Sequence, residues 1–166
     1  MTQIIIRPAD YSDAQGMCGV INPLIVDGTT TAHMTLFDVE RAVQHYIQPV
    51  DFISCQVALS ADRIVGFQSL QWRDRDGLRS GSAEIGTFVT PDQHGLGIGH
   101  LLFAATLDVA KDSGVTVMDA TIRAYNVPSL AFYSKLGFLD NKVYENIPLS
   151  DGTLVDRIQK LYWLDG

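Results

Sequence analysis

Basic side chains, cysteine and long apolar runs are all scarce in this sequence of 166 residues. It has 12 Lys and Arg against 19 Asp and Glu, which gives a formal net charge of -7. A nucleic-acid surface usually needs clustered Lys and Arg, so this balance argues against one. The two cysteines, Cys18 and Cys55, lie in apolar contexts. They favour a reducing compartment and give no sign of a disulfide scaffold.

Targeting and membrane-spanning segments are also not evident in the sequence. The N-terminus has no apolar signal-peptide core, and no apolar run is long enough to span a bilayer. We therefore expect a cytoplasmic protein that binds neither a membrane nor nucleic acid. A chain of this length fits one compact domain, residues 1–166, and it contains no repeat or linker.

Two helices are expected in the first third of the chain. Asp10 and Asp13 have the spacing of a capping box, and apolar residues then recur at helical spacing. Thr35 and Asp38 form a similar pair before a second helix, which Pro49 ends. The expected apolar faces are Met17, Val20, Ile21 and Leu24 in the first helix, and Leu36, Val39, Val43 and Ile47 in the second.

Strand patterns occupy most of the remaining chain, with two further helices between them. A helix is expected over residues 100–112, and another follows Asn126 and ends at Gly137. The third helix is expected to bury Leu101, Ala105 and Val109. The expected strands are residues 4–7, 54–59, 63–72, 83–90, 115–122, 142–147 and 157–164. The order βααβββαβαββ predicts an α/β fold (α+β by stricter naming), with helices on both faces of one mixed sheet of about seven strands.

The run Gln93-His94-Gly95-Leu96-Gly97-Ile98-Gly99 joins a predicted strand to a predicted helix. Glycines before a helix leave its first N–H groups free, and these donors with the helix dipole favour a phosphate-bearing ligand. A P-loop would continue with Lys and Ser or Thr, whereas Gly99 is followed by His100. A dinucleotide motif would have G-x-G-x-x-G after the first strand. The loop therefore predicts another pyrophosphate ligand, the alternative being a simple connecting turn.

With a second motif, this loop resembles that of the GNAT superfamily of N-acetyltransferases, nearest the phosphinothricin-type branch. The family loop reads Arg or Gln, two residues, Gly, one residue, then Gly or Ala. Gly97 and Gly99 match its small positions, while His94 departs from Arg or Gln. The second motif resembles N-x-x-A-x-x-x-Y-x-x-x-G-F, with Ser129 in place of the alanine. It reads Asn126-Val127-Pro128-Ser129-Leu130-Ala131-Phe132-Tyr133-Ser134-Lys135-Leu136-Gly137-Phe138.

The resemblance covers essentially the whole chain and implies acetyl-CoA as co-substrate. It implies that the sheet splays between its fourth and fifth strands, where the cofactor arm enters. Asn126 is also a helix cap, Ser129 can simply support the first turn, and His94 can be an exposed loop residue. The implied cofactor-binding residues are Phe88, Val89, Thr90, His94, Gly95, Leu96, Gly97, Ile98, Gly99, His100, Asn126 and Ser129.

Glu84 and Tyr133 are the candidate catalytic residues for acetyl transfer to an amine. Strand alternation places Glu84 on one face with Gly86 and Phe88, and desolvation there would raise its pKa towards that of a general base. The similar position carries glutamate in phosphinothricin-type members; a salt bridge or solvated edge is the alternative. The family motif makes Tyr133 the acid for the departing thiolate, with a core role as the alternative. A main-chain N–H near Val89 would polarise the carbonyl.

The leading hypothesis is an enzyme that moves an acetyl group from acetyl-CoA to the primary amine of a small molecule. Residues 24–35 and the surroundings of Trp72 are expected to line the amine pocket. The alternatives are acetylation of a protein N-terminus or lysine, and a non-catalytic acyl-CoA-binding module. No metal site is expected, because the histidines show no ligand spacing. A homodimer is compatible with a small single-sheet enzyme.

Overall fold

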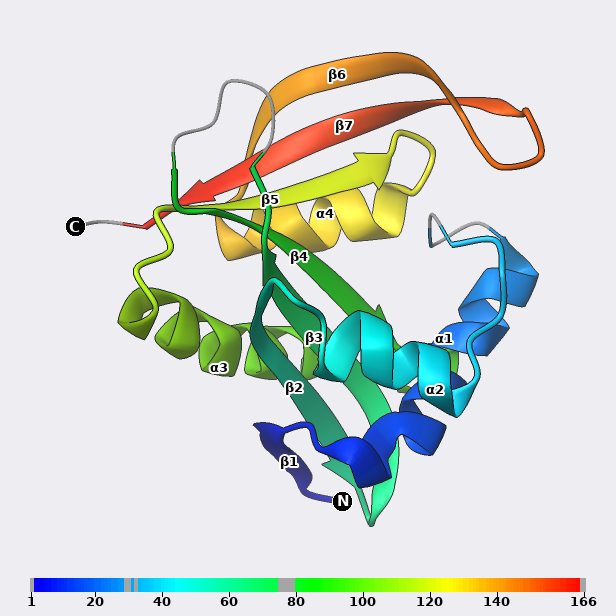
Figure 1. Cartoon of the computed structure of the whole chain (residues 1–166), viewed down its shortest axis with the longest axis vertical. Helices are drawn as coiled ribbons and strands as arrows, with labels where there is room; N and C mark the ends of the chain where they lie inside the picture. Colours follow the sequence, from blue (N-terminus) through cyan, green and yellow to red (C-terminus); the bar gives the residue numbers. More distant parts are fainter. Residues whose placement is uncertain (1, 29–30, 32, 75–79, 165–166) are drawn as a thin grey trace.

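The computed structural model describes residues 2–28, 31, 33–74 and 80–164. Its centre is a seven-stranded sheet in the order β1-β2-β3-β4-β5-β7-β6 (Figure 1). β4 and β5 are parallel, and the other neighbouring pairs are antiparallel. The strands are β1 (Ile4–Pro8), β2 (Phe52–Ser60), β3 (Arg63–Trp72), β4 (Ser82–Val89), β5 (Val117–Arg123), β6 (Leu139–Pro148) and β7 (Leu154–Trp163). The predicted mixed sheet is confirmed.

Helices pack on both faces of this sheet, as predicted (Figure 1). The α-helices of the described residues are α1 (Ala14–Asp27), α2 (Val39–Ala42), α3 (Ile98–Asp112) and α4 (Val127–Leu136). One core cluster joins α1 and the α2 region to β2 and β3, and includes Met17, Tyr46 and Phe67. A second joins α3 and α4 to β3, β4 and β5. Within the described residues, no helix combines the length and apolarity that crossing a membrane requires.

The predicted caps at Asp10 and Asn126 are present. Asp10 accepts a hydrogen bond from Ser12 N at 2.8 Å, and Asp13 accepts one from Asp10 N at 2.8 Å, which completes the capping box before α1. Asn126 caps α4 by accepting from Ser129 N at 3.3 Å. Gly137 ends α4 with φ 107°, a left-handed conformation that glycine adopts without the Cβ penalty. These termini are fixed by local chemistry.

The predicted second helix is capped by Asp38, which accepts from Arg41 N at 2.8 Å, and not by Thr35. Its predicted buried face is correct at Val43 and Ile47, which pack against the first core cluster, and wrong at Leu36 and Val39. The helix changes to a π-helical turn over Val43–Ile47. Leu36 and Val39 are exposed. The buried residues are instead Phe37, Ala42 and Tyr46. The cause is tertiary: Asn22 of α1 exchanges two hydrogen bonds with the backbone of Phe37, at 2.8 and 2.9 Å, which holds that side chain in the core.

The third helix begins at Ile98, two residues earlier than predicted, and its buried stripe also differs from the prediction. Leu101 is exposed, while Ala105 and Val109 are only partly buried. The residues that face the sheet are Ile98, Leu102, Phe103, Thr106 and Ala110. Ile98 and Leu102 pack against β2 and β3 in a third core cluster with Ala58 and Val65. This packing determines which face of α3 points towards the sheet.

The sheet splays between β4 and β5, as the family resemblance implied. The two strands are paired only at Ser82–Val117, Ala83–Met118 and Glu84–Asp119. Beyond Glu84, β4 remains paired with β3 as far as Val89, whereas β5 pairs with β7 as far as Arg123. The carboxyl-terminal halves of β4 and β5 therefore diverge and leave a gap in the sheet.

Gly99 holds α3 close to α4, and its replacement tests this packing. A Cβ built at Gly99 would lie 2.5 Å from a ring carbon of Phe132, so Gly99→Ala should destabilise the fold by about 1–3 kcal/mol. Gly19, inside α1, has no atom within 4 Å of such a Cβ. Gly19→Ala should therefore stabilise by about 0.5–1 kcal/mol. Urea unfolding measures both, and equal effects would show that the Gly99 contact does not limit packing.

Candidate active site

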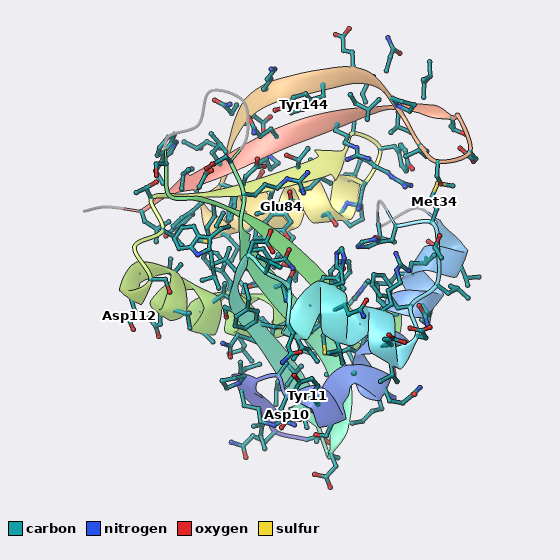
Figure 2. All side chains as sticks on the ribbon, viewed as in Figure 1. Asp10, Tyr11, Met34, Glu84, Asp112 and Tyr144 are labelled. Carbon is teal, nitrogen blue, oxygen red and sulfur yellow. The ribbon has the colours of Figure 1, made fainter. Side chains whose placement is uncertain are left out.

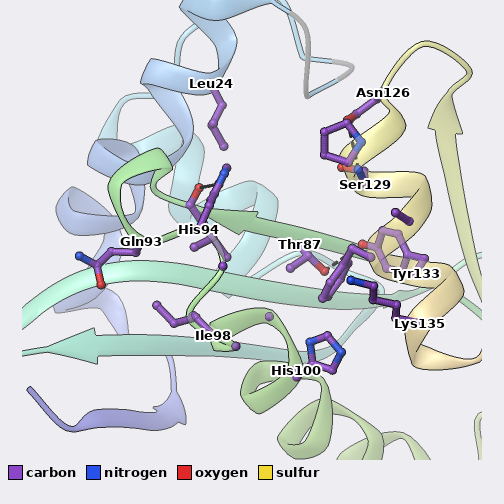
Figure 3. Close-up of a pocket in the computed structure, with 17 residues that line it drawn as sticks. Leu24, Thr87, Gln93, His94, Ile98, His100, Asn126, Ser129, Tyr133 and Lys135 are labelled. Atoms are coloured by element: carbon purple, nitrogen blue, oxygen red, sulfur yellow. Dashed lines mark hydrogen bonds between the residues drawn. The ribbon is translucent and has the colours of Figure 1, made fainter. Parts of the chain in front are cut away.

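A cleft of about 600 Å³ lies between the 90–97 loop, the start of α3 and α4 (Figure 3). Nine of the twelve residues expected to bind the cofactor line it: Val89, His94, Gly95, Gly97, Ile98, Gly99, His100, Asn126 and Ser129. The cleft wall also includes residues that were not predicted, namely Thr87, Gln93, Pro128, Ala131, Phe132 and Lys135. Leu24, which was expected to line the amine pocket, lines this cleft instead. The glycine loop and the Asn126 motif, far apart in sequence, thus form one cavity.

The loop before α3 presents a row of free backbone donors to this cleft. Among the described residues, none of the N–H groups of residues 95–100 donates to a backbone carbonyl. The first bond of the helix runs from Leu101 N to Gly97 O at 3.1 Å. Gly95 and Gly97, with φ of 79° and 80°, turn the chain through left-handed conformations. Such donors at the positive end of a helix dipole favour an anion.

Among the expected cofactor residues, three do not line the large cleft, and the side chain of a fourth, His94, bonds to the protein backbone. The imidazole Nε2 of His94 lies 2.8 Å from the carbonyl oxygen of Val89 and bonds to the end of β4. Leu96 is exposed at the loop surface, and Thr90 N donates to Val65 O at 2.9 Å. Phe88 lines a second, smaller pocket. Leu96, Thr90 and Phe88 are not among the residues that line the large cleft.

β4 also turns main-chain donors towards the gap. Thr90 N bonds to β3, and hydrogen-bonding direction alternates along an antiparallel strand. The N–H groups of Thr87 and Val89 therefore point away from β3, to the side where β5 has separated. Both residues line the large cleft. This orientation fits the predicted role of a main-chain N–H near Val89.

The smaller pocket, of about 150 Å³, adjoins the large cleft. Four residues line both cavities: Thr87, Asn126, Ser129 and Tyr133. The smaller pocket is further lined by Thr31, His33, Glu84, Ile85, Gly86, Phe88, Thr121, Ile122, Arg123 and Arg157. Two ligands, one in each cavity, would therefore meet beside the Tyr133 side chain.

The Tyr133 hydroxyl is held across the gap in the sheet. Its oxygen lies 2.8 Å from Thr87 Oγ1 (Figure 3). Gln68 Nε2 donates to the same Thr87 oxygen at 2.9 Å. Burial raises the pKa of Tyr133 to about 12, although the bond to Thr87 opposes this shift. The phenol is therefore protonated at neutral pH.

Glu84 lies on β4 near the centre of the molecule (Figure 2). Its carboxylate oxygen lies 3.1 Å from Arg73 Nη1, and its side chain is 38% exposed. The largely desolvated setting expected for this carboxylate is not found, and the alternative of a salt bridge is present. Glu84 nevertheless lines the smaller pocket with Tyr133, so the two predicted catalytic side chains share one cavity.

The predicted amine-pocket wall is partly in place. Thr31 and His33 from the 24–35 connection line the smaller pocket, and residues 29, 30 and 32 lie outside the described residues. Trp72, by contrast, lines neither cavity and packs with the second core cluster. Burial lowers the pKa of His33 to about 4, with His45 and nearby arginines adding to the effect. His33 is therefore neutral at pH 7, and its Nε2 bonds to the Tyr46 hydroxyl at 2.8 Å.

Characterised relatives of this chain include two bacterial enzymes. The L-methionine sulfoximine/L-methionine sulfone acetyltransferase of Pseudomonas aeruginosa is 30% identical over 142 residues, covering 80% of this chain and 78% of that protein. The L-amino acid N-acyltransferase MnaT of Escherichia coli is 38% identical over 77 residues, which are 46% of this chain and 44% of MnaT.

Solved structures with the same fold include two bacterial proteins. An N-acetyltransferase from Staphylococcus aureus has a TM-score of 0.85 and 18% identity, covering 99% of this chain and 100% of that one. The yncA protein of Salmonella typhimurium, solved with its cofactor acetyl-CoA, has a TM-score of 0.81 and 23% identity, covering 99% and 96%. The model of the acetyltransferase (GNAT) family matches residues 28–138. This chain therefore belongs to the GNAT family of acetyltransferases, and the predicted acyltransferase class with acetyl-CoA as co-substrate is confirmed.

Proposed function

We propose that this enzyme transfers the acetyl group of acetyl-CoA to the primary amine of a small, amino-acid-like molecule by direct attack. The observation that carries the proposal is the meeting of a cofactor-sized cleft and a small pocket at Tyr133. A pocket of about 150 Å³ suits a small amine better than a polypeptide, which would need an open groove. The substrates named for the Pseudomonas aeruginosa and Escherichia coli relatives support the same acceptor class.

Different backbone groups of the large cleft would bind different parts of acetyl-CoA. The free N–H groups of residues 95–100 would bind the pyrophosphate. The N–H groups of Thr87 and Val89 face the gap, where the pantetheine arm would take the place of a strand. A donor fixed on a strand would also stabilise the oxyanion that forms at the thioester carbonyl.

Glu84 would act as the general base. The amine nitrogen attacks the thioester carbon, and its proton must leave as the carbon–nitrogen bond forms. Glu84 lines the acceptor pocket, and its ion pair with Arg73 orients the carboxylate. The Glu84 side chain is 38% exposed, so solvent can carry the accepted proton away.

Tyr133 would act as the general acid. When the carbon–sulfur bond breaks, the thiolate takes the phenolic proton, and the phenolate regains one from solvent or from the proton released by the amine. Gln68 already donates to Thr87 Oγ1, so the Thr87 hydroxyl hydrogen can point at the phenol oxygen. The Tyr133 hydrogen is then available to the leaving group.

Two further proposals concern the cellular location of the protein and its oligomeric state. Cys18 and Cys55 are both free and buried, and burial raises the pKa of each thiol, as expected of unreactive cysteines in a reducing cytoplasm. A homodimer remains compatible with an enzyme of this size. Sedimentation analysis would report the assembly directly.

Acetyl-CoA should raise the melting temperature in a concentration-dependent way, because it would bind only the folded state, whereas NADH and ATP should not. Gly97→Val should abolish this shift, since a branched side chain would crowd the pyrophosphate. The matched control is Gly114→Val. Both glycines have positive φ (80° and 81°), and neither has an atom within 4 Å of an added Cβ. Both variants should lose about 1–2 kcal/mol of stability. If Gly97→Val still binds acetyl-CoA, the loop is a simple connecting turn and does not bind the cofactor.

Glu84→Gln should lower turnover by about 10²–10⁴ and leave acetyl-CoA affinity nearly unchanged, as expected for a lost general base. The defect should shrink as pH rises, because bulk water then supplies the neutral amine. Arg73→Gln removes the same ion pair but keeps the carboxylate, so it should cost much less activity. Equal losses in the two variants would assign Glu84 an ion-pairing role only. Initial rates of thiol release measure both variants.

Tyr133→Phe keeps the buried ring and removes only the hydroxyl. An acid role predicts a fall in kcat of about 10²–10⁴ with acetyl-CoA binding retained, softened by an acyl donor with a more acidic thiol. Tyr162→Phe is the matched control, because Tyr162 packs against the same core cluster and lines neither cavity. Its kcat should be unchanged. A wild-type kcat in Tyr133→Phe would show that Tyr133 has a packing role in the core and is not the general acid.

A further inference from the structure

The His33 side chain lines the smaller pocket and has one ring nitrogen without a partner. Its Nε2 lies 2.8 Å from the Tyr46 hydroxyl oxygen, and its backbone N–H donates to Thr31 Oγ1 at 3.2 Å. Among the residues that the structure describes, none makes a hydrogen bond with its Nδ1. Nδ1 is not fully buried, so it borders open space, and the smaller pocket is the cavity that this ring lines.

Tyr46 determines which ring nitrogen of His33 carries the hydrogen. The Tyr46 side chain is 3% exposed, and in the described part of the chain its hydroxyl has only His33 Nε2 as a partner. Burial raises the pKa of this phenol, so it keeps its hydrogen at neutral pH. A buried O–H group without an acceptor is costly, so the phenol donates to Nε2. A neutral imidazole that accepts at Nε2 has its own hydrogen on Nδ1.

The charge and the orientation of this imidazole are both fixed by its surroundings. Burial lowers the pKa of His33 to about 4, so the ring is neutral at pH 7. The ring stands edge-on to Phe37, with 5.0 Å between the centroids. Phe88, which also lines the pocket, lies 6.4 Å from it. Nδ1–H is therefore an uncharged donor on a ring that aromatic neighbours hold in place.

A structural role accounts for only one of the two ring nitrogens. The bond between His33 and Tyr46 ties the connection after α1 to the π-helical turn of Val43–Ile47. This role uses Nε2 and leaves Nδ1–H without a protein partner among the described residues. A polar hydrogen at the edge of a pocket is available to a ligand.

We propose that His33 Nδ1–H is a specificity-determining donor, which binds an uncharged oxygen on the side chain of the acceptor amine. This inference rests on the proposed function, because it assigns the acceptor to the smaller pocket. Sulfone, sulfoxide and amide oxygens have the required chemistry. One uncharged donor is too weak a partner to compensate the desolvation of a carboxylate. Tyr46 is a positioning residue, since it fixes the tautomer through Nε2.

The tautomer can be measured without any ligand. Side-chain ¹⁵N NMR of the wild type at pH 7 should show His33 with Nδ1 protonated and Nε2 unprotonated, and His33→Asn identifies its resonances. Tyr46→Phe keeps the ring and removes the donor to Nε2, so part of the population should carry the hydrogen on Nε2. A wild-type hydrogen on Nε2 overturns the proposal. An unchanged tautomer in Tyr46→Phe overturns the role of Tyr46.

Binding tests the donor itself. Calorimetric titration of the CoA-loaded enzyme compares amines that differ in side-chain oxygens: L-methionine sulfone with L-methionine, and L-glutamine with its isostere L-homoleucine. In His33→Phe, the ratio of dissociation constants in each pair should shift about three- to tenfold against the oxygen-bearing amine, the effect of one lost neutral hydrogen bond. His33→Asn can place an amide N–H near the position of Nδ1, so its shift should be smaller. Tyr46→Phe should also give a smaller shift, and the affinity for CoA should be unchanged in all three variants.

His45→Phe is the matched control. The His45 ring lies 5.2 Å from His33 and 4.5 Å from Tyr46, and burial lowers its pKa as well, but it does not line the pocket. This variant should leave both ratios unchanged. An equal shift in His45→Phe overturns the proposal, as do unchanged ratios in His33→Phe. Binding of no member of either pair by the wild type also overturns it. If His33→Phe does not fold, the wild-type spectrum and the His33→Asn titrations still decide.

The acetyl-transfer assay keeps the two hypotheses apart. If the binding ratios depend on His33 as expected but no amine is acetylated, the proposed function fails and the His33 donor stands. If amines are acetylated and neither ratio depends on His33, the donor fails and the proposed function stands.

Discussion

The separation of β4 from β5 after three paired positions is the constraint on which the rest of the structure depends. A parallel pair that continued would use the N–H groups of Thr87 and Val89 in the sheet and close the gap between the strands. The separation leaves those donors facing a cleft, and main-chain donors require a partner. The loop of residues 90–97 and the start of α3 bound the cleft on one side, and α4 bounds it on the other (Figure 3). The gap in the sheet is therefore the centre of the proposed active site.

The hydrogen bond between Thr87 and Tyr133 spans this defect and connects β4 to α4. It lies where the two cavities join, so the same contact that holds the separated elements in place also positions a phenol between the two cavities. In the smaller pocket, which is the proposed acceptor site, Glu84 is paired with Arg73, and Arg123 and Arg157 are register partners on β5 and β7. The small volume and the charged lining of this pocket distinguish it from the larger cleft.

The sequence predicted most accurately those features that neighbouring residues decide. Asp10 with Asp13, and Asn126 with Ser129, form caps within three residues, and the order of elements followed from periodicity. Helix faces were less accurate. Phe37 is buried instead of Leu36 because Asn22 holds its backbone, and Ile98 rotates α3 by docking on β2 and β3. Periodicity gives an amphipathic pattern, but a shift of one residue is decided by the neighbouring surface.

The sequence by itself determined the glycine loop and the Asn126 motif, because positive φ and helix capping are properties of a few consecutive residues. Only the tertiary structure decided which distant groups meet these motifs. Thr87 reaches Tyr133 across 46 positions in the chain, and Arg123 reaches Gly28 across 95. No local pattern marks Thr87, Arg123 or Arg157 as parts of one site. Their proximity arises from the register of β5 on β7 and the separation of β4 from β5, which packing of the whole sheet sets.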